Sequence, residues 1–169
     1  MSDSPFHKPV EPGPDQESVW DYPRPPRCEV TPETRIRVLV ADQTIVDTRA
    51  ACRVLETSHP PVYYIPVSEL NSAQLIVSDN TSWCEWKGKA SYFALRVGEI
   101  EIAGAGWFYP RPDPGFELLE RCVGFYPSKM QACYVDDEIV TPQEGDFYGG
   151  WITSKVVGPF KGGPGTRGW

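Results

Sequence analysis

The stretch Thr81–Tyr92 reads T-S-W-C-E-W-K-G-K-A-S-Y, and its twelve residues include two Trp, two Lys, one Cys and one Tyr. In an extended backbone, successive side chains point to opposite faces. Ser82, Cys84 and Trp86 then share one face, and Gly88 permits a turn because glycine tolerates positive φ. We therefore expect a strand that leads into a turn, with chemically capable side chains gathered there.

The residues after this turn continue as a second strand. Ala90–Val97 alternates, and its more apolar face is expected to meet the core through Ser91, Phe93, Leu95 and Val97. Tyr92 then projects the opposite way, toward the side of Cys84 or Lys87. The pattern predicts a hairpin with one core face and one face that carries polar and aromatic groups.

Composition favours many short elements joined by turns. The chain has 169 residues, of which 40% are hydrophobic, and it contains 18 Pro and 15 Gly. This length suits one domain with a real core, and so much Pro and Gly is unusual for a helical protein. Arg35–Val40 and Thr44–Asp47 alternate around a tight connection, which predicts a β-hairpin. We predict an all-β, mainly antiparallel protein with few or short helices.

Other strand-like stretches follow along the chain. They are Val62–Ile65, Gln74–Val77, Ile100–Trp107, Cys122–Tyr126 and Met130–Val135. We expect a turn at 78–80 and a hairpin formed by the last two stretches, whereas 48–57 is compatible with a short helix or a strand. Gly104 and Gly106 leave one strand face bare, which indicates close approach of another backbone or a ligand.

Both ends of the chain differ from its middle. Residues 1–33 are rich in Pro and predict an extended arm, anchored on the domain by Trp20 and Tyr22. Residues 34–141 form the expected core domain. Residues 142–169 combine Gly with aromatic residues, which need burial. This extension is therefore expected to wrap the domain or to join a second subunit in a homo-oligomer.

Charge and residue counts exclude several classes of function. The formal net charge is -7, which disfavours nucleic acid as a partner. No apolar run is long enough for a membrane span or a signal core, so we expect a cytoplasmic protein without a membrane partner. The five Cys lack CxxC spacing and only two His are present, which predicts reduced thiols, no metal ion and no cofactor.

Five motifs occur in a fixed order: R-I-R-V-L-V with V-D-T-R, H-P-P-V-Y-Y-I-P, T-S-W-C-E-W-K-G-K-A-S-Y, A-G-W-F-Y-P and V-G-F-Y-P. Over roughly residues 35–140, the chain resembles the family called domain of unknown function four-twenty-seven, which is sometimes labelled nucleotidyltransferase-like. The resemblance implies a β-tent fold, similar to the thalidomide-binding domain of cereblon. In such a fold two sheets meet at an angle with a pocket between them.

Small-molecule binding is the first functional hypothesis. The expected aromatic pocket is bounded by Thr81–Tyr92 and carries the rings of Tyr63, Trp86, Tyr92, Trp107 and Tyr109. Aromatic faces hold planar or cationic groups, and Lys87 would orient an anionic or carbonyl group. Core packing is the alternative explanation for each of these rings.

A cysteine-dependent enzyme of redox or hydrolytic type is the second hypothesis. Cys84 would be the nucleophile, and His59 or Lys87 would favour its thiolate; a buried, inert thiol is the alternative. A nucleotidyltransferase is less favoured because such enzymes hold Mg²⁺ with several carboxylates, and adjacent side chains at Asp136-Asp137 diverge. The remaining hypothesis is an assembly protein joined through the extension.

Overall fold

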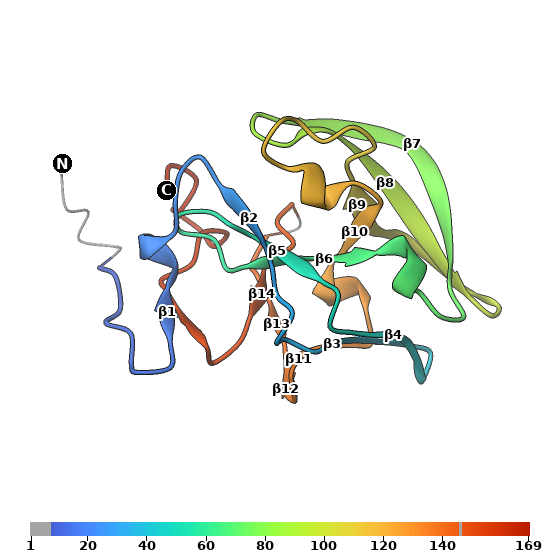
Figure 1. Ribbon diagram of the computed structural model, residues 1–169, viewed down its shortest axis with the longest axis horizontal. Helices are drawn as coiled ribbons and strands as arrows, with labels where there is room; N and C mark the ends of the chain where they lie inside the picture. Colours follow the sequence, from blue (N-terminus) through green and yellow to red (C-terminus); the bar gives the residue numbers. More distant parts are fainter. Residues whose placement is uncertain (1–7, 146) are drawn as a thin grey trace.

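The computed structural model describes residues 8–145 and 147–169, and strands make up most of its regular structure (Figure 1). Helical structure in this range is limited to the short 3₁₀ turns η1 (Val19–Asp21), η2 (Val67–Glu69), η3 (Glu117–Leu119) and η4 (Pro127–Lys129). No helix among these residues is long and apolar enough to cross a membrane. The prediction of an all-β protein with few or short helices is confirmed.

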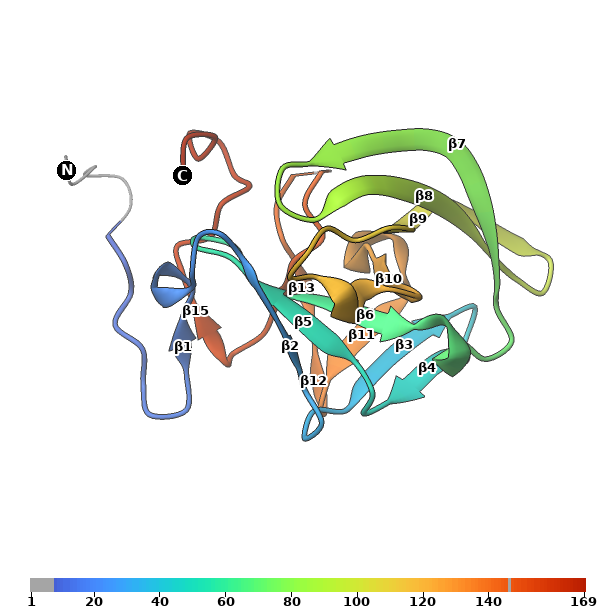
Figure 2. The ribbon, with the colours of Figure 1, turned by 45° about the horizontal axis from the view of Figure 1, so that its top comes forward.

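Two antiparallel sheets form the body of the protein. The large sheet contains, in spatial order, β2 (Arg27–Val30), β5 (Cys52–Leu55), β6 (Val62–Pro66), β10 (Cys122–Phe125), β9 (Ile100–Phe108), β8 (Gly88–Val97) and β7 (Gln74–Cys84). The small sheet contains β12 (Glu138–Ile139), β11 (Ala132–Val135), β3 (Ile36–Val40) and β4 (Gln43–Thr48). Figure 2 shows the long β7–β8 hairpin arching over the molecule, with the small sheet on the opposite side.

The β3–β4 hairpin forms as predicted. Ile36, Val38 and Val40 are buried, as the alternation requires. Ala41 and Asp42 occupy the turn with φ values of 52° and 61°. Two consecutive positive φ values are the geometry of a type I′ turn, whose twist matches that of the paired strands.

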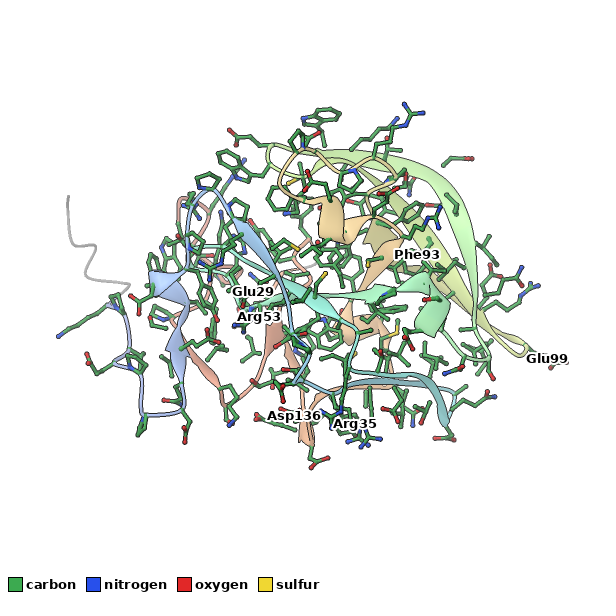
Figure 3. The ribbon with its side chains drawn as sticks, in the orientation of Figure 1. Glu29, Arg35, Arg53, Phe93, Glu99 and Asp136 are labelled. Atoms are coloured by element: carbon green, nitrogen blue, oxygen red, sulfur yellow. The ribbon has the colours of Figure 1, made fainter. Side chains whose placement is uncertain are left out.

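An apolar layer fills the space between the two sheets. The small sheet contributes Ile36, Val38, Ile45, Val46 and Cys133, and the large sheet contributes Tyr63, Ile65, Phe93, Leu95, Val97, Val123 and Phe125. Phe93 points into this layer (Figure 3), and its burial with Leu95 and Val97 confirms the predicted core face of β8. Apolar side chains therefore occupy the space where a pocket between the sheets was expected, and the cavity that carries most of the predicted site residues is in another place. It lies on the other face of the large sheet.

The predicted turn at 78–80 is wrong, because these residues belong to the continuous strand β7. Val77 pairs with Phe93 and Thr81 with Ser91, so β7 carries extra residues in a bulge. The Ser78 hydroxyl donates to the Tyr92 carbonyl at 3.0 Å. As β7 is an edge strand, its outer side tolerates these polar residues.

The predicted hairpin of β10 and β11 is also wrong. β10 pairs with β6 and β9 in the large sheet, whereas β11 pairs with β3 and β12 in the small sheet. The η4 turn lies between them and carries the chain from one sheet to the other. Alternation identified both strands correctly but holds no information about their partners.

The arm and the C-terminal extension pack against each other and against the domain. β1 (Glu17–Ser18) pairs in parallel with β15 (Val156–Val157), and β13 (Thr141–Pro142) pairs with β14 (Trp151–Ile152). Nε1 of Trp20 donates to the Pro159 carbonyl at 2.9 Å, and Tyr22 is buried. Both residues therefore anchor the arm, as predicted. Residues 1–7 of the predicted arm lie outside the described residues.

Candidate functional site

A cavity of about 290 Å³ lies on the face of the large sheet that is turned away from the apolar layer. Its lining includes seven of the candidate residues predicted from the sequence: His59, Cys84, Trp86, Lys87, Tyr92, Trp107 and Tyr109. They come from the loop before β6, the β7–β8 hairpin, and β9 with the residue that follows it. The structure thus gathers around one space residues that are far apart in the sequence.

Tyr63 is the candidate that the structure places elsewhere. It points into the layer between the sheets, where its ring centre lies 5.3 Å from that of Trp151. Neighbouring residues of a strand face opposite sides, so Tyr64 lines the cavity instead. Of the two adjacent tyrosines in β6, Tyr63 therefore packs in the layer between the sheets and Tyr64 faces the cavity.

The turn between β7 and β8 forms one wall of the cavity. Cys84 pairs with Gly88, so β7 ends before Trp86 and Lys87, which lie in the turn. Gly88 has a φ of 105°, and the Lys87 carbonyl accepts a hydrogen bond from the Asp113 amide at 3.0 Å. This bond attaches the turn to the loop after β9. Nζ of Lys87 lies 5.8 Å from the ring centre of Tyr109.

Trp107 forms a rigid floor. Its Nε1 donates to the Tyr64 hydroxyl at 3.1 Å. A Cβ atom at Gly124 would lie 2.7 Å from the indole ring, and one at Gly149 would overlap it. The ring is therefore held closely against backbone from β10 and from the C-terminal extension, which leaves it buried.

Hydroxyl groups line another part of the cavity. The Ser82 and Tyr92 hydroxyls lie 2.7 Å apart in a hydrogen bond. The Tyr126 ring centre lies 4.7 Å from that of Trp107, and burial raises the pKa of Tyr126 to about 12. Burial also raises the pKa of Tyr64 and Tyr109. These phenols are protonated at neutral pH and can donate hydrogen bonds.

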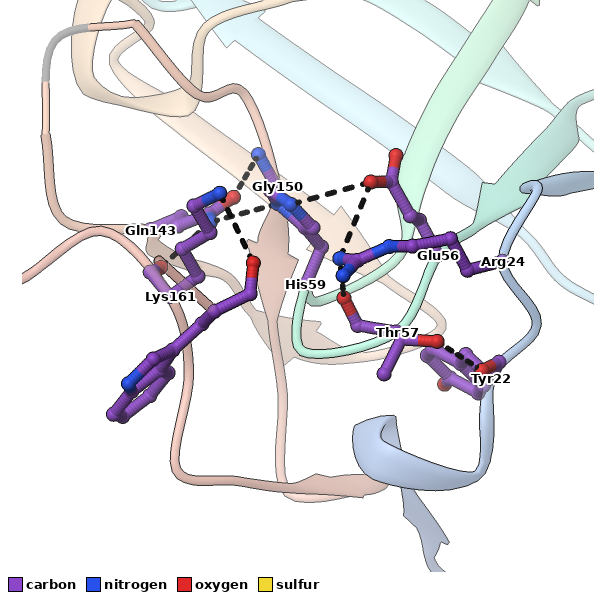
Figure 4. Close-up of polar contacts among 9 residues, drawn as sticks. Tyr22, Arg24, Glu56, Thr57, His59, Gln143, Gly150 and Lys161 are labelled. Carbon is purple, nitrogen blue, oxygen red and sulfur yellow. Dashed lines mark hydrogen bonds and ion pairs between the residues drawn. The ribbon is translucent and has the colours of Figure 1, made fainter. Parts of the chain in front are cut away.

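A hydrogen bond from Gln143 shows which nitrogen of the His59 ring carries the proton (Figure 4). The Gln143 Oε1 accepts from the Gly150 amide at 3.1 Å, and its Nε2 donates to the Lys161 carbonyl at 2.7 Å. This orients the amide, so the second Nε2 hydrogen points to Nδ1 of His59 at 3.3 Å. A nitrogen that accepts a hydrogen bond carries no proton. His59 is therefore neutral, with its proton on Nε2, which lies 3.7 Å from Glu56.

The environment of His59 predicts a loss of stability in weak acid. Burial, and then the charges of Lys161, Arg24 and Lys87, lower the pKa of His59 to about 3 from its ordinary 6.5. The unfolded chain therefore binds a proton as pH falls through 6.5, whereas the folded chain does not. From about pH 7 to about pH 5.5, we expect His59 to reduce the free energy of unfolding by about 1 kcal/mol.

Urea unfolding at each pH measures this loss in the wild type and in His59→Gln, whose side-chain oxygen still accepts a hydrogen bond from Gln143. The pH-dependent part should be smaller in the variant by about 1 kcal/mol. Equal pH profiles would contradict the neutral imidazole.

The thiols of the chain differ in whether they reach the cavity. Cys84 lines the cavity, but within the described residues no hydrogen bond or ion pair joins it to His59. A cysteine-dependent reaction at Cys84 stays a prediction. Cys52 and Cys122 lie outside the cavity, with their Sγ atoms 3.9 Å and 3.4 Å from the Leu118 carbonyl oxygen. No group of three His, Cys, Asp or Glu side chains in the described range is placed to hold a metal ion.

Sequence reasoning missed part of the lining: Glu56, Tyr64, Tyr126, Gln143, Phe147, Tyr148 and Lys161. Alternation through β10 offers a signal for Tyr126, which follows Cys122 and Gly124 on the same face. The residues of the extension have no such signal. Only the fold shows that the extension passes over the open face of the large sheet.

One of two comparisons with known proteins places the chain in a family. A comparison with curated proteins finds no match. Residues 27–136 match the model of a family described as a domain of unknown function, DUF427. The matched span runs from β2 to the residue after β11, about two thirds of the chain. The likeness to cereblon stays a prediction. Because the match covers more than half of the chain, this protein belongs to the family of the domain of unknown function DUF427.

Proposed function

We propose that the protein binds a small planar molecule in the cavity between the large sheet and the C-terminal extension. The observation that carries this proposal is the lining: aromatic rings from β6, β8 and β9, from the β7–β8 turn and from the extension surround one space. Its volume of about 290 Å³ lies near the lower end of ligand pockets, at about 300 Å³. A ligand of one or two rings suits this size.

The rings differ in how much surface they offer. Trp107 and Tyr109 are buried and provide a fixed floor. Trp86 and Tyr92 are only half-buried, so each retains surface that a ligand can cover. Removing that surface from water favours binding, and a planar group can lie against a ring with little distortion.

Polar groups at the cavity can fix the orientation of a ligand. The Tyr92 hydroxyl, paired with Ser82, and the Tyr126 hydroxyl can each bond a polar edge of a ligand. A few placed polar groups among apolar rings are typical of small-molecule sites. Binding, rather than packing alone, accounts for aromatic rings left partly exposed beside hydrogen-bonding groups.

Trp86→Ala tests this proposal. Calorimetry is applied to planar one-ring and two-ring compounds that are neutral, anionic or cationic. We expect at least one to bind the wild type, and the variant to bind it at least about tenfold more weakly, because a buried aromatic face is lost. The fold should persist, since Trp86 lies in a turn and is half-buried. Trp107→Ala is a poorer test, because Trp107 packs against Gly124 and Gly149.

Tyr134→Ala is the matched control, because Tyr134 is a half-buried aromatic residue in β11 and lies outside the cavity lining. A second readout is the rate of alkylation at Cys84, which a bound ligand should slow, while buried Cys133 provides an internal reference. Unchanged affinity in Trp86→Ala would exclude the proposed site, and so would a panel without a binder.

Assembly through the extension remains a separate prediction. The extension packs on its own domain, where Trp151 is fully buried, so deleting residues 145–169 would remove core as well as surface. Mass measured over a range of concentrations for the intact chain is therefore the suitable test. A mass that stays at the monomer value would exclude the homo-oligomer.

A further inference from the structure

The cavity carries basic groups although the whole chain is acidic. The net charge of the protein is -7, yet Lys87 and Lys161 both line the cavity, one from the β7–β8 turn and one from the extension. Both are half-buried. A partly buried ammonium group loses hydration, which hydrogen-bond acceptors or an anion must replace. The charges that line the cavity therefore indicate which charge a ligand should carry.

The acidic residues of the lining do not neutralise this pair. Glu56 lies 3.5 Å from Arg24 and 3.7 Å from Nε2 of His59, so its charge is offset by Arg24. Glu85 is exposed, where water and salt screen its charge. His59, which also lines the cavity, is neutral, because burial lowers its pKa and its Nδ1 accepts a hydrogen bond from Gln143. The interior of the cavity is left with an excess of positive charge.

Contacts with neighbouring residues place the ammonium groups of the two lysines at the cavity. Nζ of Lys161 lies 5.7 Å from the ring centre of Tyr148 and donates to the main-chain oxygen of Trp169 at 3.2 Å. In the part of the chain that the structure describes, Lys87 forms no ion pair. The positive charges of both lysines also contribute to the lowered pKa of His59, so both charges lie close enough to influence the same imidazole. Each keeps N–H groups available for an anion.

We propose that the ligand of this cavity is a planar aromatic acid, with its ring against Trp86 and Tyr92 and its carboxylate toward Lys87 and Lys161. This inference rests on the proposed function and adds the chemical class of the ligand. A carboxylate accepts charge-assisted hydrogen bonds from ammonium groups, and these are stronger than bonds between neutral partners. The acidic remainder of the protein repels anions elsewhere, so the cavity is the place where an anion is favoured.

The test compares matched compounds that differ in charge. Naphthoate, naphthamide and naphthylmethylammonium share one ring system, and calorimetry at one fixed salt concentration measures the Kd of each for the intact chain. We expect naphthoate to bind at least about tenfold more tightly than naphthamide, because a charged hydrogen-bond partner is replaced by a neutral one. We expect the ammonium compound to bind most weakly.

Variants of one lysine identify the anion contact. Lys87→Met should bring the two affinities to within about threefold, and Lys87→Arg should restore the preference, because arginine keeps the charge. Lys89→Met is the matched control: Lys89 lies two residues away, is exposed and does not line the cavity. This control should retain the preference for naphthoate.

The outcomes separate the two proposals. Equal binding of naphthoate and naphthamide, with Trp86→Ala still weakening both, would overturn the acidic ligand and leave the planar-ligand site intact. A preference for naphthoate that persists in both Lys87→Met and Lys161→Met would also overturn it. Failure of all three compounds to bind, or to slow alkylation at Cys84, would overturn both proposals together.

Discussion

Trp151→Ala is expected to lower the free energy of unfolding by about 3–5 kcal/mol, the usual cost of removing a large buried aromatic side chain. Only 1% of Trp151 is exposed. Its ring packs on Tyr63, and its Nε1 donates to the Phe125 carbonyl at 3.3 Å. The variant leaves a cavity and an unpaired carbonyl at the core. Urea unfolding followed by circular dichroism measures the difference.

Trp83→Ala is the matched control for this experiment, because Trp83 is 74% exposed. Its cost should stay within about 0.5 kcal/mol, as for most surface substitutions. Trp151 lies beyond the family match at 27–136. A large loss at Trp151 would therefore show that the extension is part of the cooperative domain, and a loss below about 1 kcal/mol would contradict its place in the core.

Gly106→Ala is expected to cost at least about 3 kcal/mol, above the usual range for overpacking because the obstacle is backbone. A Cβ atom at Gly106 would overlap the Gly124 carbonyl oxygen and lie 2.6 Å from the Phe93 ring. Gly106 lies in β9 and pairs with Phe125 of the neighbouring strand β10. The added methyl group would force these strands apart. The same urea experiment measures the effect.

Gly104→Ala separates this clash from ordinary backbone strain. Gly104 has a φ of 60°, and nothing lies within 4 Å of a Cβ atom placed there. Alanine should therefore cost only about 1 kcal/mol, the penalty of a left-handed conformation. A loss in Gly106→Ala that is no larger than the loss in Gly104→Ala would contradict the predicted clash with β10.

Local pattern predicted those parts of the fold that depend on neighbouring residues. Alternation with a tight turn identified the β3–β4 hairpin, and alternation in β8 identified Phe93 and Leu95 as core. The bare face at Gly106 correctly indicated a close backbone. Gly104 instead supports a bulge, because Phe93 pairs with Gly106 but Leu95 with Ile102. Sheet partners were not predictable, because an isolated strand has no preference that distinguishes one apolar neighbour from another.

The candidate site was predictable only where its residues lie on regular strands. The sequence motifs identified the β7–β8 hairpin and Trp107, but the choice between Tyr63 and Tyr64 depends on which face of β6 meets the second sheet. Gln143 and Lys161 reach the cavity through contacts with residues about 80–100 positions away in the chain. No local propensity encodes such a long-range contact.

The cover of the cavity has a consequence for synthesis of the protein. Gln143, Gly149 and Lys161 complete the wall, and the ribosome makes them after every strand of the large sheet. A growing chain therefore carries an open aromatic face until this segment has emerged, and such a face attracts chaperones and other nascent chains. The proposed ligand would also lack a complete site before this event, so a chain stalled before Gln143 should associate with other chains and should not bind that ligand.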